Sequence, residues 1–279
     1  MKSIRSNLFI QTSYVQKLQS VIIVTQASIT VIDPGFFPDE ISEIQKYAAQ
    51  FDGSGRKKYL ILTHSDVDHI AGVHAFPDYS VLVASTWNKE NERRSIETLE
   101  FIDTSNYLDR PWSGPMPPIV ADRLLEDGEQ FAEFTFYHTK GHTSDGLILL
   151  HDGVAIVGDY LSAVEFPFIF TSYRDYLGTL KKLRTVFAEH DIQLVIAQHG
   201  PAATTKEEIQ RRIHMSEDYI HRLEDLVQGA ISVGLEMEAT VQKSRGFLYE
   251  DRSIPVGVQN LHDNNVQKMY KELQTVQPS

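Results

Sequence analysis

The stretch LTHSDVDH, residues 62–69, places two histidines and two aspartates at the end of an apolar run. The preceding run KYLILT (58–63) is almost continuously aromatic or aliphatic and predicts a buried strand. The polar residues therefore lie in the loop after that strand, and a short helix is expected to begin near His69. Such a loop is a candidate functional site, and it raises the question of why Asp66 stands between the histidines.

The sequence before this loop predicts a β-α-β unit. Two runs rich in β-branched residues, 20–24 and 28–32, are closed by the turn sequence Asp33-Pro34-Gly35. Residues 38–51 begin with proline, carry acids in the first turn and repeat apolar side chains at helical spacing, so they predict an amphipathic helix. Asp33 is thus expected at the carboxyl end of a strand.

Three further apolar runs lead into a histidine or an aspartate. They are EFTFYHT (133–139) before His142, GVAIVGD (153–159) ending in Asp159, and IQLVIAQ (192–198) before His199. In open α/β sheets the carboxyl ends of the strands converge on one edge, and ligands bind in the crevice there. Four segments that are far apart in the sequence can therefore build one site.

Together these segments offer three carboxylates and four imidazoles: His64, Asp66, Asp68, His69, His142, Asp159 and His199. This donor set suits metal ions better than an acid-base pair, because borderline divalent cations bind histidine and aspartate well. Seven ligands are too many for one tetrahedral ion, whereas two ions that share a bridging ligand account for all of them. The chain contains no cysteine, which excludes thiolate ligands and disulfides.

The motifs THSDVDH, TKGHTSDG, VGD and QHGP, in this order, are similar to those of the metallo-β-lactamase fold hydrolases over roughly residues 20–201. The usual pattern of that family is Thr-His-x-His-x-Asp-His, then Gly-His, then Asp or Cys, then a last His. The resemblance implies an α/β fold, a four-layer αβ/βα sandwich of the metallo-β-lactamase type. It is highly specific for the fold and weakly specific for the substrate.

The resemblance also implies a role for each candidate ligand. The first metal would be held by His64 and His142, the second by Asp68, His69 and His199, and both by a bridging Asp159. Asp33 resembles an early aspartate of the family that supports the site from behind the ligands. The expected cofactor is a pair of divalent ions, zinc first, with manganese or iron as alternatives.

Asp66 departs from the family pattern, which usually has its second histidine at this position. An aspartate oxygen lies as many bonds from the backbone as histidine Nδ1, so Asp66 is expected to reach the first metal as well. Its charge brings the ligands and a bridging hydroxide to four negative charges, against four positive charges on two divalent ions. We therefore expect a harder first site that accepts manganese or iron, a less acidified hydroxide and weaker attraction of anionic substrates. Loss of one ion is left open.

The activity that the resemblance implies is hydrolysis by a metal-bound hydroxide, oriented by Asp68, of an ester-like bond in a small molecule such as a thioester or a lactone. Two alternatives stay open. One is a phosphodiesterase or nuclease of the same fold, and the other is a metal-dependent protein that binds a metabolite without turnover. The sequence does not identify the residues that contact the substrate.

The chain is long enough for one large core. Residues 1–203 are expected to form the hydrolase domain and 204–279 a helical C-terminal extension packed on it, with Thr205 and Glu208 as a capping box at its start. The segment 87–131 shows no clear sheet pattern, and its role is open.

Composition restricts the partners of the protein. The 26 Lys and Arg against 38 Asp and Glu give a formal net charge of −12, so nucleic acid and anionic membrane surfaces are disfavoured and a small-molecule substrate is expected. The N-terminal residues lack the apolar core of a signal peptide and no run is long enough to span a bilayer, so a cytoplasmic location is expected. The C-terminal helices leave a homodimer open.

Overall fold

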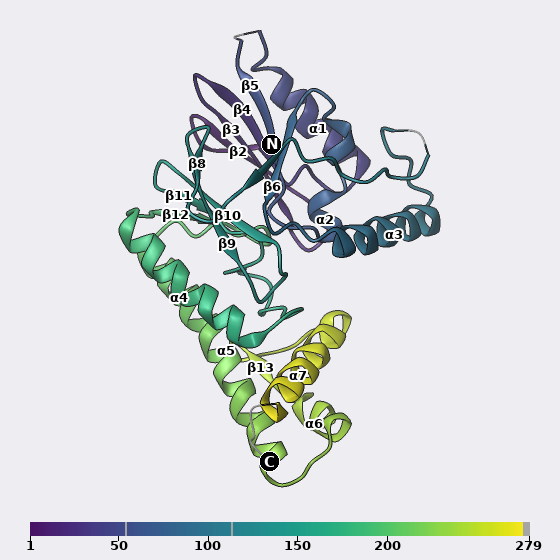
Figure 1. Cartoon of the computed structure of the whole chain (residues 1–279), viewed down its shortest axis with the longest axis vertical. Helices are drawn as coiled ribbons and strands as arrows, with labels where there is room; N and C mark the ends of the chain where they lie inside the picture. The colour runs from purple at the N-terminus through teal and green to yellow at the C-terminus, as the bar shows by residue number, and fades with distance from the viewer. Residues whose placement is uncertain (54, 113, 276–279) are drawn as a thin grey trace.

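The computed structural model describes residues 1–53, 55–112 and 114–275, and Figure 1 shows the whole chain. Residue 113 of the segment 87–131 and the last four residues of the predicted extension lie outside this description. The described chain contains two large β-sheets that pack face to face, with helices on the outer face of each. The four-layer αβ/βα sandwich implied by the sequence resemblance is confirmed.

The first sheet has seven strands whose spatial order follows the chain. They are β1 (Lys2–Arg5), β2 (Leu8–Thr12), β3 (Gln19–Val24), β4 (Ser28–Ile32), β5 (Lys57–Ile61), β6 (Ser80–Ala84) and β7 (Arg123–Leu125). Strands β1 to β4 pair antiparallel, whereas β4 to β7 pair parallel. The predicted β-α-β unit is confirmed, because α1 (Pro38–Ala49) connects the parallel strands β4 and β5.

The second sheet has five strands in the order β12-β11-β10-β9-β8. They are β8 (Gln130–Phe131), β9 (Phe134–Thr139), β10 (Gly146–His151), β11 (Val154–Ile156) and β12 (Leu194–Ile196). Within this sheet β11 and β12 pair parallel, and the other neighbours pair antiparallel. The two parallel strands precede Asp159 and His199, so those two residues leave the sheet at the same edge.

Side chains alternate between the two faces of each strand, so each sheet packs against the other sheet on one face and against helices on the other. In β3, Val21 and Ile23 face the second sheet, while Ile22 and Val24 face the helical layer. All four side chains are buried. A strand buried on both faces reads as a continuous apolar run, which is why QSVIIV could be recognised in the sequence.

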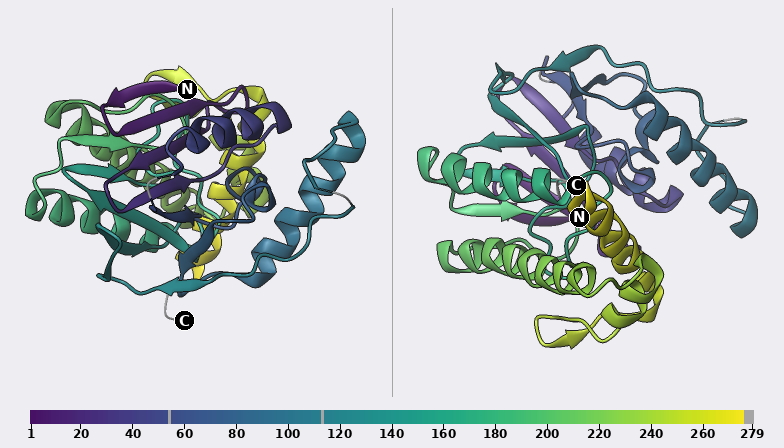
Figure 2. Two further views of the ribbon diagram at one scale, coloured as in Figure 1. Left: turned by 90° about the horizontal axis from the view of Figure 1, so that it is seen from above. Right: turned by 60° about the horizontal axis from the view of Figure 1, so that its bottom comes forward.

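Helices on the first sheet are α1, α2 (Val67–Ile70) and α3 (Lys89–Asn106), with a short 3₁₀ turn η1 (Val73–Ala75) between the last two. The second sheet is covered by α4 (Tyr173–Glu189) and α5 (Lys206–Ser232). Figure 2 shows α3 and the pair α4 and α5 on opposite sides of the sheets. None of the described helices combines the length and the hydrophobicity that crossing a bilayer requires.

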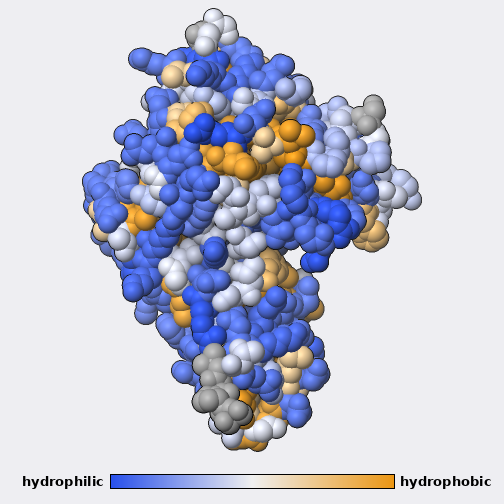
Figure 3. All heavy atoms as spheres, in the orientation of Figure 1, coloured by the Kyte–Doolittle hydropathy of each residue, from blue (hydrophilic) through white to orange (hydrophobic). Residues whose placement is uncertain are grey.

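The C-terminal part continues the helical layer of the second sheet. After α5 come α6 (Met237–Ser244), the hairpin of β13 (Leu248–Tyr249) and β14 (Arg252–Ser253), the turn η2 (Val256–Val258) and α7 (Gln259–Gln274). These elements share one hydrophobic cluster with α4 and the second sheet. Figure 3 shows a mostly hydrophilic surface over them on the visible face, as expected of amphipathic helices with their apolar sides turned inward.

Two features of the chain differ from the sequence pattern. The segment 87–131 contains the 18-residue helix α3, whose buried residues are only Glu92, Ser95 and Leu99, so the sequence shows no apolar stripe there. Gly229 and Gly234 indicate a helix break in the sequence, but α5 runs through Gly229 and ends at Ser232. At the start of α5 the Thr205 hydroxyl accepts from the Glu208 N–H, while the Glu208 carboxylate binds arginines of its own helix.

Candidate metal centre

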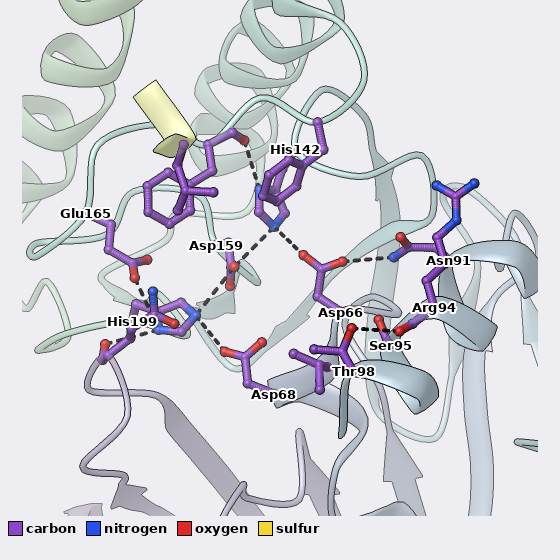
Figure 4. Close-up of a pocket in the computed structure, with 15 residues that line it drawn as sticks. Asp66, Asp68, Asn91, Arg94, Ser95, Thr98, His142, Asp159, Glu165 and His199 are labelled. Atoms are coloured by element: carbon purple, nitrogen blue, oxygen red, sulfur yellow. Dashed lines mark hydrogen bonds and ion pairs between the residues drawn. The ribbon is translucent and has the colours of Figure 1, made fainter. Parts of the chain in front are cut away.

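The candidate ligands converge at the edge of the sandwich where the strands end. His64 and Asp66 follow β5, Asp68 and His69 lie in α2, and the remaining three follow β9, β11 and β12. Figure 4 shows Asp66, Asp68, His142, Asp159 and His199 directed toward one another from different loops. The structure therefore brings all seven predicted residues together, in three overlapping groups of histidine and aspartate.

The first group consists of His64, Asp66 and His142, whose ligand atoms all lie within 4.8 Å of one another. His142 Nε2 lies 3.3 Å from His64 Nε2 and 3.4 Å from Asp66 Oδ2. His64 Nε2 is 3.7 Å from the same Asp66 oxygen. Asp66 thus stands where the family pattern has a histidine and turns one oxygen to both rings.

The second group consists of Asp68, His69 and His199. Asp68 Oδ2 lies 3.6 Å from His69 Nε2 and 3.4 Å from His199 Nε2. Both rings are buried, while the Asp68 side chain keeps 14% of its surface exposed. This carboxylate therefore faces two rings and also the pocket above them.

Asp159 lies between the two groups. Its Oδ2 is 3.2 Å from His142 Nε2, 3.6 Å from His64 Nε2 and 3.5 Å from His199 Nε2. Its Oδ1 is 3.3 Å from His69 Nε2. One carboxylate therefore contacts rings of both groups, as a bridging ligand must.

Two buried atoms test whether these side chains fit divalent ions. Within the described chain, His69 Nε2 and Asp159 Oδ1 lie 3.3 Å apart, but neither makes a hydrogen bond of acceptable geometry to the other or to any other group. A buried polar atom left unpaired costs about 1–3 kcal/mol, so such atoms usually have an unseen partner. The donors around them are imidazole nitrogens and carboxylate oxygens, the ligands that zinc, manganese and iron accept. The residues present fit such ions.

The pKa values of the cluster are strongly shifted. Burial acts to raise the pKa of Asp66 and of Asp159, but the neighbouring histidines outweigh it and hold both pKa values well below the usual range. Burial acts to lower the pKa of His69 and His142, but the carboxylates, Asp159 first, raise the pKa of both rings well above the usual value. The rings must therefore release protons before their nitrogens bind a cation, which couples metal binding to pH.

Asp33 is fully buried and fixes His69 from behind. Its Oδ2 accepts hydrogen bonds from Thr63 Oγ1 at 2.7 Å and Gln198 Nε2 at 2.8 Å, and lies 2.9 Å from His69 Nδ1. Its Oδ1 accepts from the Thr63 N–H at 2.8 Å. Asp33 has φ of 48°, a left-handed conformation that aspartate tolerates better than most residues. The bond to Nδ1 leaves His69 Nε2 directed at the cluster.

Backbone carbonyls orient two further rings. His142 Nδ1 lies 2.9 Å from the carbonyl oxygen of Phe168, and His199 Nδ1 lies 3.1 Å from that of Gln16. A carbonyl only accepts, so each Nδ1 donates to it. Each Nε2 is then the nitrogen that faces the cluster and can bind a cation once it has released its proton. Phe168 lies in the loop between β11 and α4, and Gln16 in the loop between β2 and β3. Sequence reasoning missed both, because a carbonyl partner leaves no residue signature.

Asp66 is supported from the helix that the sequence did not reveal. Asn88 caps α3, and in its first turn Asn91 Nδ2 donates to Asp66 Oδ1 at 2.9 Å and to Ser65 Oγ at 2.8 Å. Figure 4 shows Asp66 between Asn91 and His142. One carboxylate oxygen is therefore held by α3 while the other faces the rings, an arrangement that fixes the side chain in a ligand's orientation.

Gly141 is needed for the approach of α4 to the site. It has φ of 114°, and a Cβ at this position would lie 2.3 Å from the Cα of Tyr176. Only glycine allows α4 to pack so closely against the end of β9. This packing sets the position of His142, the next residue in the chain.

A pocket of about 330 Å³ opens above the cluster. The helix α3 lines one side with Asn91, Arg94, Ser95 and Thr98, and Figure 4 shows these residues along one wall. The opposite side carries Glu165 and Phe168 from the loop after β11, with Leu261 of α7. Burial, with Asp159 and Asp68 nearby, raises the pKa of Glu165 to about 7. None of these wall residues belongs to a recognisable motif after a strand, so their place at the site could not be predicted from the sequence.

The C-terminal helix α7 holds the loop that carries Phe168. Asn265 is fully buried. Its Oδ1 accepts from the Ile169 N–H at 2.8 Å, and its Nδ2 donates to the Pro167 carbonyl at 2.6 Å. Asn264 Nδ2 donates to the Ile169 carbonyl at 3.0 Å. The Phe168 carbonyl of the same loop accepts from His142 Nδ1. By holding this loop, α7 indirectly fixes the orientation of one candidate ligand.

An αβ/βα sandwich with histidines and aspartates clustered at its sheet edge defines a class of metal-dependent hydrolases. The family model of the metallo-beta-lactamase superfamily matches residues 18–189, more than half of the chain. The chain belongs to this superfamily and is a metal-dependent hydrolase. The matched region contains six of the seven candidate ligands and ends before His199. No curated protein matches the chain.

Solved structures share the fold at low sequence identity. The DIM-1 metallo-beta-lactamase exposed to ceftazidime has a TM-score of 0.56 at 13% identity, over 78% of this chain and 95% of that chain. A metallo-beta-lactamase from Pontibacter korlensis has a TM-score of 0.53 at 16% identity, over 76% and 97%. The stereoselective inverting sec-alkylsulfatase Pisa1 from Pseudomonas sp. has a TM-score of 0.70 at 12% identity. That match covers 99% of this chain and 50% of the sulfatase, so this chain spans about half its length.

Proposed function

We propose that the protein hydrolyses an ester-like bond of a small molecule, such as a thioester or a lactone, with two divalent ions as cofactors. His64, Asp66 and His142 would hold one ion, and Asp68, His69 and His199 the other. The observation that carries the proposal is the position of Asp159, whose carboxylate contacts rings of both groups at 3.2–3.6 Å. Zinc is the first candidate, and manganese or iron are the alternatives because Asp66 makes the donor set richer in oxygen.

Divalent ions at these positions would lower the pKa of a bound water and polarise the bond that breaks. The protein side chains contribute orientation and charge. Asp68 lies at the pocket floor between His69 and His199, where its carboxylate can orient the attacking water and accept its proton. Arg94 is the one arginine or lysine of the pocket wall within the described chain. Its Nε pairs with Glu90 at 3.0 Å, and its remaining guanidinium nitrogens can attract a polar group of the substrate.

The test is turnover by metal-loaded protein on panels of thioesters, lactones, phosphodiesters and alkyl sulfates. Hydrolysis of thioesters or lactones is expected, and the formal net charge of −12 disfavours long nucleic acids. Turnover confined to phosphodiesters would overturn the proposal. Alkyl sulfates belong in the panel because the match to the sulfatase extends over nearly the whole chain, C-terminal helices included.

A binding protein without turnover is the alternative from a different class. His69→Ala and Asp159→Ala are the discriminating variants, because both remove atoms from the middle of the cluster. For an enzyme, hydrolysis is lost in both while the fold is retained by circular dichroism. For a metabolite-binding protein, ligand affinity falls and no hydrolytic rate is lost. Elemental analysis of the purified protein identifies the native metal and its stoichiometry.

Three expectations remain proposals. The first is a domain boundary between residues 203 and 204. The second is a cytoplasmic location, which cell fractionation tests. The third is a homodimer, which light scattering of the purified protein tests. The partner supported by the pocket is a small molecule, since its volume of about 330 Å³ lies at the lower end of the usual range for ligand sites.

A further inference from the structure

A second cavity, of about 390 Å³, lies next to the candidate metal centre. One wall is the loop 163–168, which follows Asp159 after a few residues. The other wall is built by the C-terminal segment 249–258, which contains the β13-β14 hairpin and η2. Residues of the loop between β2 and β3 complete the lining. The cavity is thus a product of the C-terminal extension and the hydrolase domain together.

The second cavity adjoins the pocket above the cluster. Gln16, Glu165 and Phe168 line both. The shared wall is anchored to the site, because Ser162 Oγ donates to the His199 carbonyl at 3.0 Å and accepts from the Glu165 N–H at 3.0 Å. A ligand whose reactive group lies over the cluster would reach the cavity across this shared edge, next to Phe168.

Most of the cavity wall is apolar. Its apolar side chains are Ala163, Val164, Phe166, Phe168, Ile254 and Val258. Phe166, Phe168 and Ile254 are each less than 9% exposed, and Phe166 and Phe168 pack edge to face with ring centroids 4.8 Å apart. The charged residues of the lining are Lys17, Glu165, Glu250 and Arg252, of which Glu250 is paired with Arg211. An apolar chamber beside a polar reaction site suits an amphiphile with its reactive head at the cluster.

We propose that this cavity binds an apolar chain of the substrate. The inference rests on the proposed function, which it sharpens to esters or thioesters with an apolar chain on one side of the scissile bond. Hydrolysis adds one water and releases an acid and an alcohol or thiol. The chain belongs either to the acid or to the leaving group, and the test separates these two cases.

The kinetic test uses two ester series and metal-loaded protein. In one series 4-nitrophenyl esters run from acetate to octanoate, and in the other alkyl acetates run from methyl to octyl. We expect kcat/KM to rise about fourfold for each added methylene in one series, from the roughly 0.8 kcal/mol that burying a methylene contributes. The series that responds identifies the side of the bond. Rates independent of chain length in both series, with turnover present, would overturn the inference.

Two valine variants locate the effect. Val164→Glu places a charge in the wall at a position that is 52% exposed, so the fold tolerates it. It is expected to abolish the rise of kcat/KM with chain length. Val256→Glu is the matched control, because Val256 is 94% exposed, belongs to the same C-terminal segment and does not line the cavity. An equal loss in both variants, or in neither, contradicts the assignment of the cavity.

Calorimetric titration with butyrate, hexanoate and octanoate, and with the matching alcohols, separates this inference from the proposed function. Affinity that increases with chain length, with a negative heat-capacity change, and that is lost in Val164→Glu supports the cavity even if no ester is turned over. Ester turnover without any such binding trend leaves the hydrolase in place and rejects the cavity as a chain site.

Discussion

Asp66 is the residue that distinguishes this site from the usual pattern of its superfamily. One of its oxygens faces His64 and His142, and the other accepts from Asn91. The reach expected from bond counting is therefore present in the structure. The consequence of the change is electrostatic, because a carboxylate adds a negative charge where a neutral ring would stand.

The substitution Asp66→His tests that consequence. It removes one negative charge and one oxygen donor, so we expect the zinc content to rise relative to manganese and iron when the three metals are offered in competition. Elemental analysis of the competed protein measures the ratio, and Asp122→His at an exposed site is the control for a surface histidine. An unchanged metal ratio would count against Asp66 as a ligand.

Asn91 is a positioning residue for Asp66. Asn91→Ala removes the hydrogen bond to Asp66 Oδ1, and loss of such an outer contact typically lowers metal affinity about 10–100-fold. Chelator competition measures the affinity. Asn106→Ala, at the other end of the same helix, is the matched control and leaves the affinity unchanged. If both variants bind metal like the parent protein, Asn91 only packs against the loop.

At the scale of elements, α5, α6 and α7 are joined through a buried neutral network. The His262 ring of α7 lies 2.8 Å from the Tyr219 hydroxyl of α5 through Nδ1 and 3.3 Å from the Ser244 carbonyl of α6 through Nε2. Asn265 Nδ2 donates to the same hydroxyl at 2.9 Å. Because the carbonyl accepts from Nε2 and the hydroxyl donates to Nδ1, a proton added to Nδ1 would break the network.

This network predicts acid sensitivity of the C-terminal helices. Burial lowers the pKa of His262 below its ordinary value of 6.5, so the unfolded chain binds a proton that the folded chain does not. The contribution of His262 to stability is complete above pH 6.5 and is lost as the pH falls from there through the lowered pKa, by about 1.4 kcal/mol for each unit of the shift.

Chemical denaturation between pH 7 and pH 5 measures the effect. His262→Gln is expected to flatten the dependence of unfolding free energy on pH in this window, because it removes the titrating group. His221→Gln, an exposed histidine of α5, should leave the dependence unaltered and serves as the control. Parallel pH profiles for all three proteins would show that His262 does not contribute.

Some elements could be predicted from the sequence because their burial leaves a pattern. The strand β3 contains the apolar run 21–24, β4 is rich in β-branched residues and β5 ends in an apolar run, while α1 repeats Ile41, Ile44 and Ala48 on its buried face. The helix α3 could not be predicted, since it buries two polar residues and one leucine and presents most of its surface to solvent. Its place is set by tertiary contacts to the site loops, which a local pattern does not contain.

The same distinction applies to the site. The seven candidate ligands could be selected because their motifs occur in a fixed order after strands. The groups that orient these ligands could not be predicted from the sequence. His142 and His199 are held by backbone carbonyls, and Asp66 is held by a residue of α3. The residues of the pocket walls could not be predicted from the sequence either. Leu261, for example, comes from a helix whose position relative to the sheets depends on the whole fold.

At the scale of the whole molecule, the C-terminal helices complete the layer on the second sheet. The buried side of α5 carries Ile209, Ile213, Ile220, Leu223 and Val227, all in one cluster with α4 and that sheet. Removing them from water contributes roughly 1.5–3 kcal/mol each. Without α5, the matching apolar side chains of α4 and the second sheet would also be exposed to water.

Truncation after residue 203 is therefore expected to destroy cooperative folding, although the removed part lies outside the hydrolase domain expected from the sequence. Near-ultraviolet circular dichroism and gel filtration of the 1–203 fragment should show loss of fixed tertiary packing and association. A monomeric fragment with a cooperative melt would show instead that the boundary separates two independent units, with the full chain as the reference.

The positions of Leu261 in the pocket wall and of Asn265 behind the loop that carries Phe168 also have a consequence for biosynthesis. The strands and all seven candidate ligands leave the ribosome before α7 does, but fixed packing around them is expected only after the C-terminal helices have joined the layer on the second sheet. A chain that terminates early would hold the ligand residues without the packing that positions them. The metal centre and the wall above it are therefore expected to form together, late in synthesis.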